Sequence, residues 1–493
     1  MTQHVDVLII GAGLSGIGAA AHLRRECPGK TFAIIERRTS MGGTWDLFKY
    51  PGIRSDSDMF TLGYNFKPWT QDKSIADGQS ILNYIKETAD EYSITDHINY
   101  GLKVTAVNWC SQDAQWTVTA LCEKSQTTNT FTCSFLMGCT GYYNYDAGYT
   151  PKFPGIEQFK GEVVHPQKWD DSINYSNKRV VIIGSGATAV TLLPSMADQA
   201  MHVTMLQRSP SYVATVPEKD HISIALRKFL PEKIVYQMAR VRNVGIQRGV
   251  YELSKKRPRI VRRALLTAAK RQLGDQFDMT HFRPKYNPWD ERLCAVPDGD
   301  LFKTLKQGKG SVVTDHIEAF TENGIRLTSG KELEADMVVT ATGLDLMIFG
   351  DIKPTVDGNP VKISDGLTYK GAMISGMPNF SMTFGYTNSS WTLKADIIAE
   401  YCCRLIKYMD KKKIAYCVPE PSAQDASDAP FLDLQSGYVM RAKDKLPRQG
   451  NNGPWKVVQN YFHDIKTIRY SPLNDGNLRF IGKHSKVAEL SLV

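Results

Sequence analysis

A glycine-rich turn near the start of the chain is the first pattern that can do chemistry. Gly11, Gly13 and Gly16 follow an apolar run over 5–10, and Glu36 ends a second apolar run over 32–35. Glycines at this spacing allow a tight turn, let backbone N–H groups approach a pyrophosphate, and let a helix pack closely on a strand. A carboxylate twenty positions after Gly16 can accept hydrogen bonds from ribose hydroxyls. The segment therefore predicts a strand, turn, helix and strand that bind an adenine dinucleotide.

A second turn of the same kind follows an apolar run over 180–183, but its charge is reversed. The next apolar run, over 202–206, ends at Gln207 and Arg208, where the first segment has an acid. A guanidinium can hold a 2′-phosphate that a carboxylate would repel, so we expect NADP(H) at this turn. The alternative, that Arg208 is a solvated charge at a strand end, stays open. The predicted ligands are Gly184, Ser185, Gly186, Ala187, Thr188, Gln207 and Arg208.

Two dinucleotide sites in one chain indicate electron transfer from a nicotinamide to a flavin. Reductases that pass electrons on to a disulfide need a cysteine pair close to the first site, but the stretch over 41–46 has no cysteine. Molecular oxygen is the remaining common acceptor, and a tryptophan such as Trp45 can line a water-poor pocket that protects a flavin–oxygen adduct. We therefore expect FAD at the first turn, NADPH at the second, and oxygen as a substrate.

The rest of the chain predicts the elements that position these sites. Alternating runs over 103–109 and 116–121 predict a β-hairpin, and apolar runs over 135–141 and 337–343 predict strands that each lead into Thr-Gly. Helical spacing is found over 222–229, again over 260–273, and over 391–409. The predicted fold class is α/β, with two Rossmann-like dinucleotide-binding domains and a helical insert. We expect the FAD-binding domain over 1–145 and 380–493, the NADP-binding domain over 151–215 and 301–345, and the helical insert over 216–300.

A third motif lies ahead of the second turn. Phe159, Gly161, His165, Trp169 and Asp170 fill every fixed position of FxGxxxHxxxW(P/D). With this motif the chain resembles the type I Baeyer–Villiger monooxygenases, which are class B flavoprotein monooxygenases. The stretches GGTWDLFKYPGIRSDSDMFTLGY, GSGATAVTL and YNPWDERLC are most similar to the bacterial subgroup that includes the ethionamide-activating monooxygenase. The resemblance implies that the motif lies at a hinge between domains. Without the resemblance, His165 and Trp169 are equally well explained as an ordinary packed pair.

The resemblance also implies roles for two charged residues. Arg292, within 286–293, matches the arginine beside the flavin, and Asp56 matches the aspartate that orients it. A fixed cation can hold a peroxide deprotonated and stabilise the alkoxide that follows. Many family members carry Lys where this chain has Glu291, so selectivity for NADPH depends more on Arg208 here. The other implied cofactor-binding residues are Ser15, Thr44, Trp45, Asp46 and the main chain of Val104 for FAD, and Arg54, Ser55 and Asp56 for NADP.

The expected reaction is the NADPH- and O2-dependent Baeyer–Villiger oxidation of ketones to esters or lactones through a C4a-peroxyflavin, with sulfoxidation as a second activity. Oxygenation of nitrogen or sulfur as the main activity is the alternative. The expected partners are small ketones or sulfides and molecular oxygen, without nucleic acid or a bound metal. A nucleic-acid-binding or membrane-binding protein on a degenerate scaffold would leave both glycine turns and the hinge motif unexplained.

Composition agrees with a multidomain globular protein. The chain has 493 residues, of which 42% are hydrophobic and 23% charged, and this mixture excludes a disordered or fibrous class. Its nine cysteines include no CxxC pair, and no apolar run reaches about 18 residues. We therefore predict neither a disulfide framework nor a zinc site nor a membrane-spanning helix. The run at 5–10 leaves no room for a leader peptide, so a cytoplasmic location is expected.

The net charge of +9 is concentrated in the predicted insert. Residues 221–278 contain 14 Lys and Arg against four Asp and Glu, a charge of +10, so the rest of the chain carries −1. The basicity therefore says nothing about the two nucleotide-binding segments. A solvated helix face is the favoured interpretation. Weak peripheral contact of the insert with an anionic membrane is the alternative.

Overall fold

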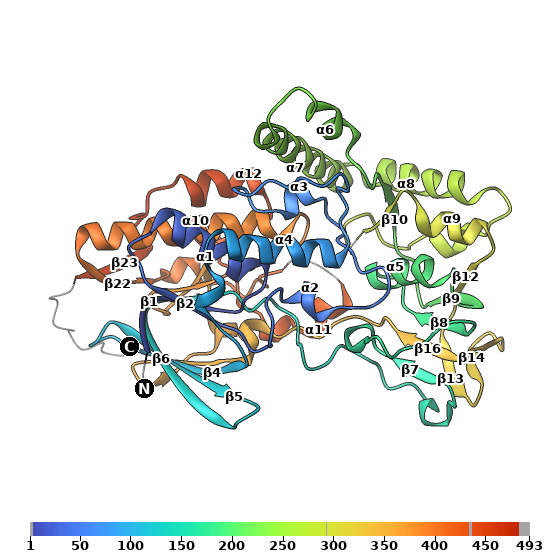
Figure 1. Cartoon of the computed structure of the whole chain (residues 1–493), viewed down its shortest axis with the longest axis horizontal. Helices are drawn as coiled ribbons and strands as arrows, with labels where there is room; N and C mark the ends of the chain where they lie inside the picture. The colour runs from blue at the N-terminus through green and yellow to red at the C-terminus, as the bar shows by residue number, and fades with distance from the viewer. Residues whose placement is uncertain (1–2, 292, 433–435, 483–493) are drawn as a thin grey trace.

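Two β-sheets with parallel central strands form the framework of the molecule, one towards each end of its long axis (Figure 1). The computed structural model describes residues 3–291, 293–432 and 436–482. In each sheet a central strand enters a glycine turn and then a helix. β1 (Gln3–Ile10) leads into α1 (Leu14–Glu26), and β8 (Arg179–Ile183) leads into α5 (Ala187–Met196). The predicted α/β fold with two Rossmann-like units is confirmed, whereas the domain boundaries stay a prediction.

The larger sheet has nine strands in the order β18-β17-β4-β5-β6-β1-β2-β3, with β21 (Phe380–Met382) also paired to β6. β1 lies parallel between β2 (Phe32–Ile35) and β6 (Thr127–Gly138). β4 (Leu102–Cys110) and β5 (Gln115–Cys122) are antiparallel, which confirms the predicted hairpin. The short strands at its edges are β3 (Ile98–Asn99), β17 (Lys353–Val356) and β18 (Asn359–Pro360).

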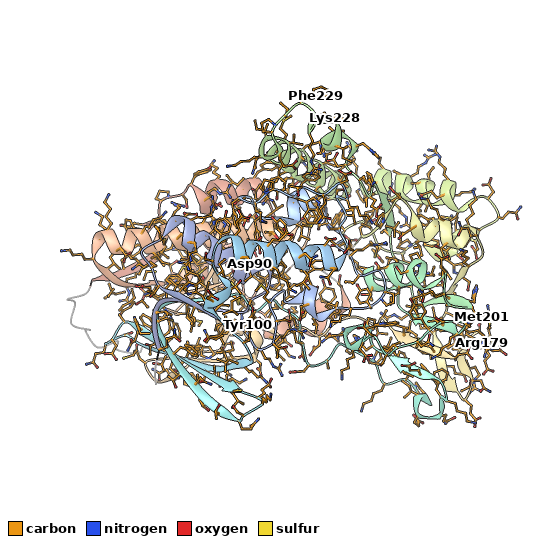
Figure 2. The ribbon with its side chains drawn as sticks, viewed as in Figure 1. Asp90, Tyr100, Arg179, Met201, Lys228 and Phe229 are labelled. Carbon is orange, nitrogen blue, oxygen red and sulfur yellow. The ribbon has the colours of Figure 1, made fainter. Side chains whose placement is uncertain are left out.

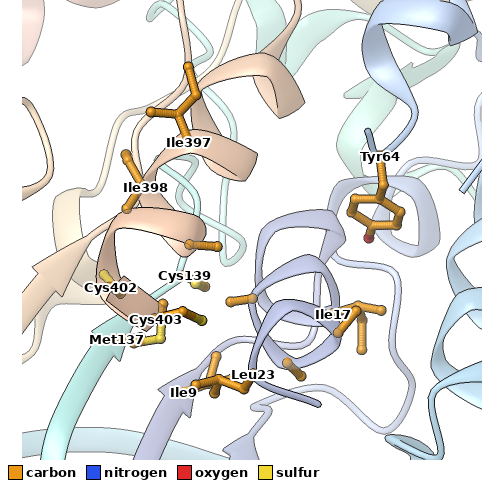
Figure 3. Close-up of a cluster of buried hydrophobic side chains, with 14 of the residues drawn as sticks. Ile9, Ile17, Leu23, Tyr64, Met137, Cys139, Ile397, Ile398, Cys402 and Cys403 are labelled. Carbon is orange, nitrogen blue, oxygen red and sulfur yellow. The ribbon is translucent and has the colours of Figure 1, made fainter. Parts of the chain in front are cut away.

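α1 packs against α10 (Trp391–Lys412) and α4 (Gly78–Glu91). Figure 3 shows Ile17 and Leu23 of α1 in the same buried cluster as Ile397 and Ile398 of α10, with Ile9 of β1 beneath them. The predicted helix over 391–409 is confirmed, and its partner is the helix that follows the first glycine turn. Because small and branched side chains fill this contact completely, the start of α1 is held in one place.

The smaller sheet is entirely parallel, with five strands in the order β12-β9-β8-β16-β7. α5 and α9 (Asp300–Lys306) pack beside it. An antiparallel sheet of three short strands adjoins it. These two sheets contain β7 (Glu162–Val164), β9 (His202–Gln207), β12 (Gly310–Thr314), β13 (Ile317–Thr321), β14 (Gly324–Leu327), β15 (Glu332–Glu334) and β16 (Met337–Thr340).

Three helices run along the top of the molecule in Figure 1: α6 (His221–Leu226), α7 (Glu232–Lys256) and α8 (Pro258–Leu273). Two strands in this region were not predicted. They are β10 (Val213–Val216) and β11 (Cys294–Pro297), which pair in parallel. The shorter elements are α2 (Thr44–Leu47), α3 (Met59–Leu62), α11 (Gly437–Arg441), α12 (Tyr461–Asp464), β19 (Thr368–Tyr369), β20 (Met373–Ile374), β22 (Ile414–Pro419) and β23 (Leu478–Gly482).

Candidate dinucleotide sites and active site

The first glycine turn has the backbone that its residue types predict. Gly11 has φ +101°, and a Cβ added there would lie 2.6 Å from the carbonyl oxygen of Cys139. A Cβ on Gly16 would lie 1.8 Å from the carbonyl oxygen of Gly11. Gly13 precedes α1 without a side-chain cap, so the first N–H groups of the helix lack an acceptor within the helix and point out of its end. These N–H groups suit a phosphate ligand.

Glu36 lies beside this turn, as predicted. Glu36 is 6% exposed, and its carboxylate accepts hydrogen bonds from the backbone N–H groups of Ala12 (2.7 Å) and Arg38 (2.8 Å). Burial raises the pKa of Glu36, while these hydrogen bonds oppose the rise. The N–H of Leu102 in β4 donates to the main-chain oxygen of Glu36 at 3.0 Å. The predicted main-chain site at Val104 is two residues further along β4, where the pairing with β5 is irregular.

A second wall faces the turn, and it begins at two glycines that were not predicted to belong to the site. Gly42 donates its N–H to the carbonyl oxygen of Ala12 at 2.9 Å, and the Cα of Gly43 would lie 3.5 Å from a Cβ on Gly13. These two glycines lead into α2, which carries Thr44, Trp45 and Asp46. Asp46 pairs with Arg38 at 2.5 Å. Although burial alone would raise it, the pKa of Asp46 is lowered by hydrogen bonds from Ser40 and Arg38.

Aromatic side chains close the other side of the turn. The hydroxyl oxygen of Ser15 accepts a hydrogen bond from the indole N–H of Trp391 at 2.7 Å, which joins the start of α1 to the start of α10. The indole ring of Trp391 stacks on Tyr142 with ring centres 5.0 Å apart and lies 5.3 Å from Phe384. Ser15 was predicted to bind the cofactor, whereas this aromatic wall was not.

The second glycine turn is more open than the first. Gly184 has φ +144°, and a Cβ there would lie 2.3 Å from the carbonyl oxygen of Ala341. Gly186 and Ala187, at the start of α5, are exposed, and a Cβ on Gly186 would meet nothing within 4 Å. The Ser185 hydroxyl donates to the carbonyl oxygen of Ser209 at 3.0 Å. The N–H groups at the start of α5 are therefore open to a ligand.

The two residues predicted to select NADP at this turn have different environments. Gln207 is buried, and its amide NH2 donates to the carbonyl oxygen of His281 (2.7 Å) and the hydroxyl of Thr314 (2.9 Å). Arg208 is exposed and forms no ion pair with another described residue. Burial raises the pKa of Glu291, while the charge of nearby Arg208 opposes the rise. Arg208 and Glu291 thus share one corner of this site.

The loop over 50–56 connects the first site to the helices of the second. A Cβ on Gly52, where φ is +74°, would lie 1.8 Å from the hydroxyl oxygen of Ser195 in α5. Burial raises the pKa of Tyr50 to about 12, while its hydrogen bond with Thr188 opposes the rise. Arg54 pairs with Asp300 of α9 at 2.5 Å. The predicted ligands of this loop therefore lie between the two glycine turns.

The two residues with predicted catalytic roles are only partly described. Asp56 is exposed at the end of this loop, next to Ser55, which is buried. Arg292 lies outside the described residues, so its contact with Asp56 stays a prediction. The preceding loop is held against α7, because Lys255 donates to the carbonyl oxygen of Trp289 at 3.0 Å and pairs with Asp290 at 3.2 Å.

The hinge motif spans β7, and its His165 lies at the carboxyl edge of the smaller sheet. The Nδ1 of His165 accepts the backbone N–H of Gln167 (3.1 Å), which leaves Nε2–H to donate to the carbonyl oxygen of Gly343 (3.3 Å). Burial lowers the pKa of His165, so its ring is neutral near pH 7. A Cβ on Gly148 would lie 2.0 Å from this ring, and the Gln167 side chain donates to the carbonyl oxygen of Asn144 at 2.8 Å. His165 and Gln167 therefore hold the segment that connects the two sheets.

The other motif residues support this arrangement from the side. Phe159 is buried against Phe320, with ring centres 5.9 Å apart, and Gly161 leaves room for the carbonyl oxygen of Asp336. Trp169 is also buried. Asp170 is exposed, and hydrogen bonds from Ser172 lower its pKa. The burial of Trp169 agrees with the alternative that this residue packs in the ordinary way, while His165 makes the polar contacts described above.

A family comparison agrees with this geometry. Residues 5–353 match the model for flavin-binding monooxygenase-like proteins. The chain belongs to that family. It is 50% identical to the FAD-containing monooxygenase EthA of Mycobacterium tuberculosis over 489 residues, which is 99% of this chain and 100% of EthA. The predicted resemblance to flavoprotein monooxygenases is confirmed.

Two solved structures share the fold. A steroid monooxygenase described as bound to NADP has a TM-score of 0.78 at 22% identity and covers 97% of this chain and 100% of its own. Cyclohexanone monooxygenase in an open form has a TM-score of 0.72 at 21% identity, over 85% of this chain and 90% of its own.

Among the helices of the described residues, none is both long and apolar enough to cross a membrane.

Proposed function

We propose that this flavin monooxygenase uses FAD, NADPH and O2 to convert ketones to esters or lactones. The observation that carries the proposal is the pair of glycine turns on either side of the loop over 50–56. The first turn has an acid, Glu36, and the second has a base, Arg208, and the hinge motif is complete. The names of the relative EthA and of the cyclohexanone and steroid monooxygenases support the assignment.

The first site fits FAD because its glycines let the backbone segments approach closely and leave the end of α1 uncovered by side chains. Gly13 and Gly43 are in close backbone contact, and the open N–H groups of α1 can hold a pyrophosphate. Glu36 can exchange its backbone hydrogen bonds for those of ribose hydroxyls. Trp391 and Tyr142 supply a flat, largely water-free wall for an aromatic ring system. Bound FAD would supply hydride acceptance and oxygen activation.

The second site fits NADPH because α5 presents open N–H groups and Arg208 lies exposed at the end of β9. The guanidinium of Arg208 can hold the 2′-phosphate and so favour NADPH over NADH. The negative charge of nearby Glu291 opposes this preference. His165 donates to the carbonyl oxygen of Gly343 and holds the segment that connects the two sheets. Through this contact, movement of the NADPH site would be transmitted to the flavin site.

Arg292 is proposed as the catalytic cation. Its guanidinium keeps its proton, so it can stabilise the negative charge that develops on the ketone oxygen. Asp56, on the loop that reaches both sites, is proposed to orient it.

The proposed reaction is tested by adding NADPH, oxygen and a phenyl ketone to the purified FAD-loaded protein and identifying the product by mass. We expect a phenyl ester. In the Arg292→Ala variant we expect NADPH oxidation with release of hydrogen peroxide but no ester. Ester formation by that variant would refute the role of Arg292, and oxygenation of a thioether without any ketone oxidation by the wild type would favour sulfur oxygenation as the main activity.

A further inference from the structure

The insert carries most of the large hydrophobic side chains that are exposed in the described chain. Nine of the fourteen lie over 222–260, and the exposed fraction of Phe229 is 83%. Exposed apolar side chains that are gathered in this way mark an interaction surface. The nine residues are Ile222, Phe229, Ile234, Met238, Val241, Ile246, Val250, Leu253 and Ile260.

The two sides of α7 differ sharply. Ile234, Met238 and Val241 follow the i, i+4, i+7 spacing of one helix stripe and are all exposed. On the opposite side Arg240 is buried, where it donates to the carbonyl oxygens of Phe60 (2.9 Å) and Gly63 (2.7 Å) and pairs with Asp396 (3.1 Å). α7 is therefore fixed to the body of the protein by one face and presents the other outward.

The insert is also rich in basic side chains, with 14 Lys and Arg against four Asp and Glu over 221–278. Some of these cations pair with acids outside that range, as Arg242 does with Asp220. Lys228 and Lys233 are exposed and form no ion pair with another described residue. An open groove of about 350 Å³ along α8 is lined by five cations, and these are Arg259, Arg262, Arg263, Lys270 and Arg283. Figure 2 shows Lys228 and Phe229 side by side at the outer tip of the insert. A cation and a large apolar ring thus project from the same point.

We propose that the outer face of α6, α7 and α8 docks on an anionic lipid surface. The apolar side chains would enter the boundary between headgroups and acyl chains, and the basic ones would contact lipid phosphates, as in interfacial amphipathic helices. A solvated charged face does not account for nine exposed large hydrophobic residues. A symmetric contact with a second copy would bring two faces with exposed, unpaired cations together, which like-charge repulsion disfavours.

Vesicle sedimentation of the full-length FAD-loaded protein tests the proposal. We expect binding to phosphatidylglycerol–phosphatidylcholine vesicles, little binding to phosphatidylcholine alone, and loss of binding between about 0.05 and about 0.5 M salt, because salt screens the charges. Removing two charges with Lys228→Gln and Lys233→Gln should lower the partition coefficient roughly 30-fold. Phe229→Ser with Val241→Ser should lower it by at least about tenfold.

Matched variants elsewhere distinguish the surface from a general effect of charge or hydrophobicity. Lys411→Gln with Lys412→Gln removes two exposed cations from the end of α10, and Met201→Ser with Met440→Ser removes two exposed apolar side chains. Neither pair should change vesicle binding. Equal loss in control and insert variants, or no binding to anionic vesicles, would overturn the proposal. So would concentration-dependent dimerisation that the Phe229 and Val241 changes abolish, or duplex DNA binding without vesicle binding.

Discussion

Replacing Arg208 by Gln should weaken the use of NADPH far more than that of NADH. Arg208 is exposed and forms no ion pair with another described residue, so its charge is free for a 2′-phosphate. That phosphate carries a charge of about −1.5 to −2 near pH 7. Unit charges about 4 Å apart attract by ~1 kcal/mol in water. We therefore expect the KM for NADPH to rise roughly 10- to 30-fold.

The assay is steady-state oxidation of NADPH and of NADH by the purified FAD-loaded protein, followed by loss of nicotinamide absorbance. The KM for NADH should stay within about twofold, because NADH lacks the phosphate that Arg208 would hold. Arg271→Gln, which removes an exposed arginine from α8, is the control and should change neither KM. Glu291→Gln should lower the KM for NADPH, because Glu291 places an opposing charge near Arg208. Equal changes for the two nucleotides in Arg208→Gln would refute phosphate recognition by this residue.

Two further predictions follow from the glycine turn and the hinge motif. Gly16→Ala should yield protein without the yellow absorbance of bound flavin and with a lower Tm, since its Cβ would lie 1.8 Å from the carbonyl oxygen of Gly11. Gly29→Ala, whose Cβ would meet nothing within 4 Å, is the control, and equal flavin loss in both would contradict the argument. Because the pKa of His165 is lowered in the folded protein, its contribution to stability is complete above its usual value of 6.5 and is lost as the pH falls through the lowered pKa. The Tm of His165→Asn should therefore fall less steeply than that of the wild type below about pH 6.5 in thermal unfolding scans, and parallel curves would rule out this linkage.

Sequence patterns predicted the parts of the fold that depend on neighbouring residues. The runs before and after each glycine turn are short and apolar, and the first run of each pair ends at a glycine, so β1, β2, β8 and β9 lie where the sequence places them. The long periodic run that forms α10 was also recognisable. The four-residue strand β11 was not, since a run of that length does not distinguish a strand from an irregular segment.

Contacts between distant segments account for what the sequence could not predict about the candidate site. Trp391 meets Ser15 across 376 positions, and Gly43 meets Gly13 only after the chain has formed β2 and returned. Gln207 was predicted to be a ligand because it lies at the end of a strand. Its amide NH2 instead donates hydrogen bonds to His281 and Thr314, which are both far along the chain. The exposed apolar stripe on α7 required knowledge of which helix face is buried, and the sequence pattern alone did not reveal it.

Isotope labelling tests the central claim most directly. The FAD-loaded protein is given NADPH, a phenyl ketone and ¹⁸O₂, and the product is analysed by mass spectrometry. The proposed function predicts a phenyl ester that contains one ¹⁸O atom in its new C–O–C linkage, in an amount that rises with the NADPH consumed. NADPH consumption without a labelled ester from any ketone tested would contradict it.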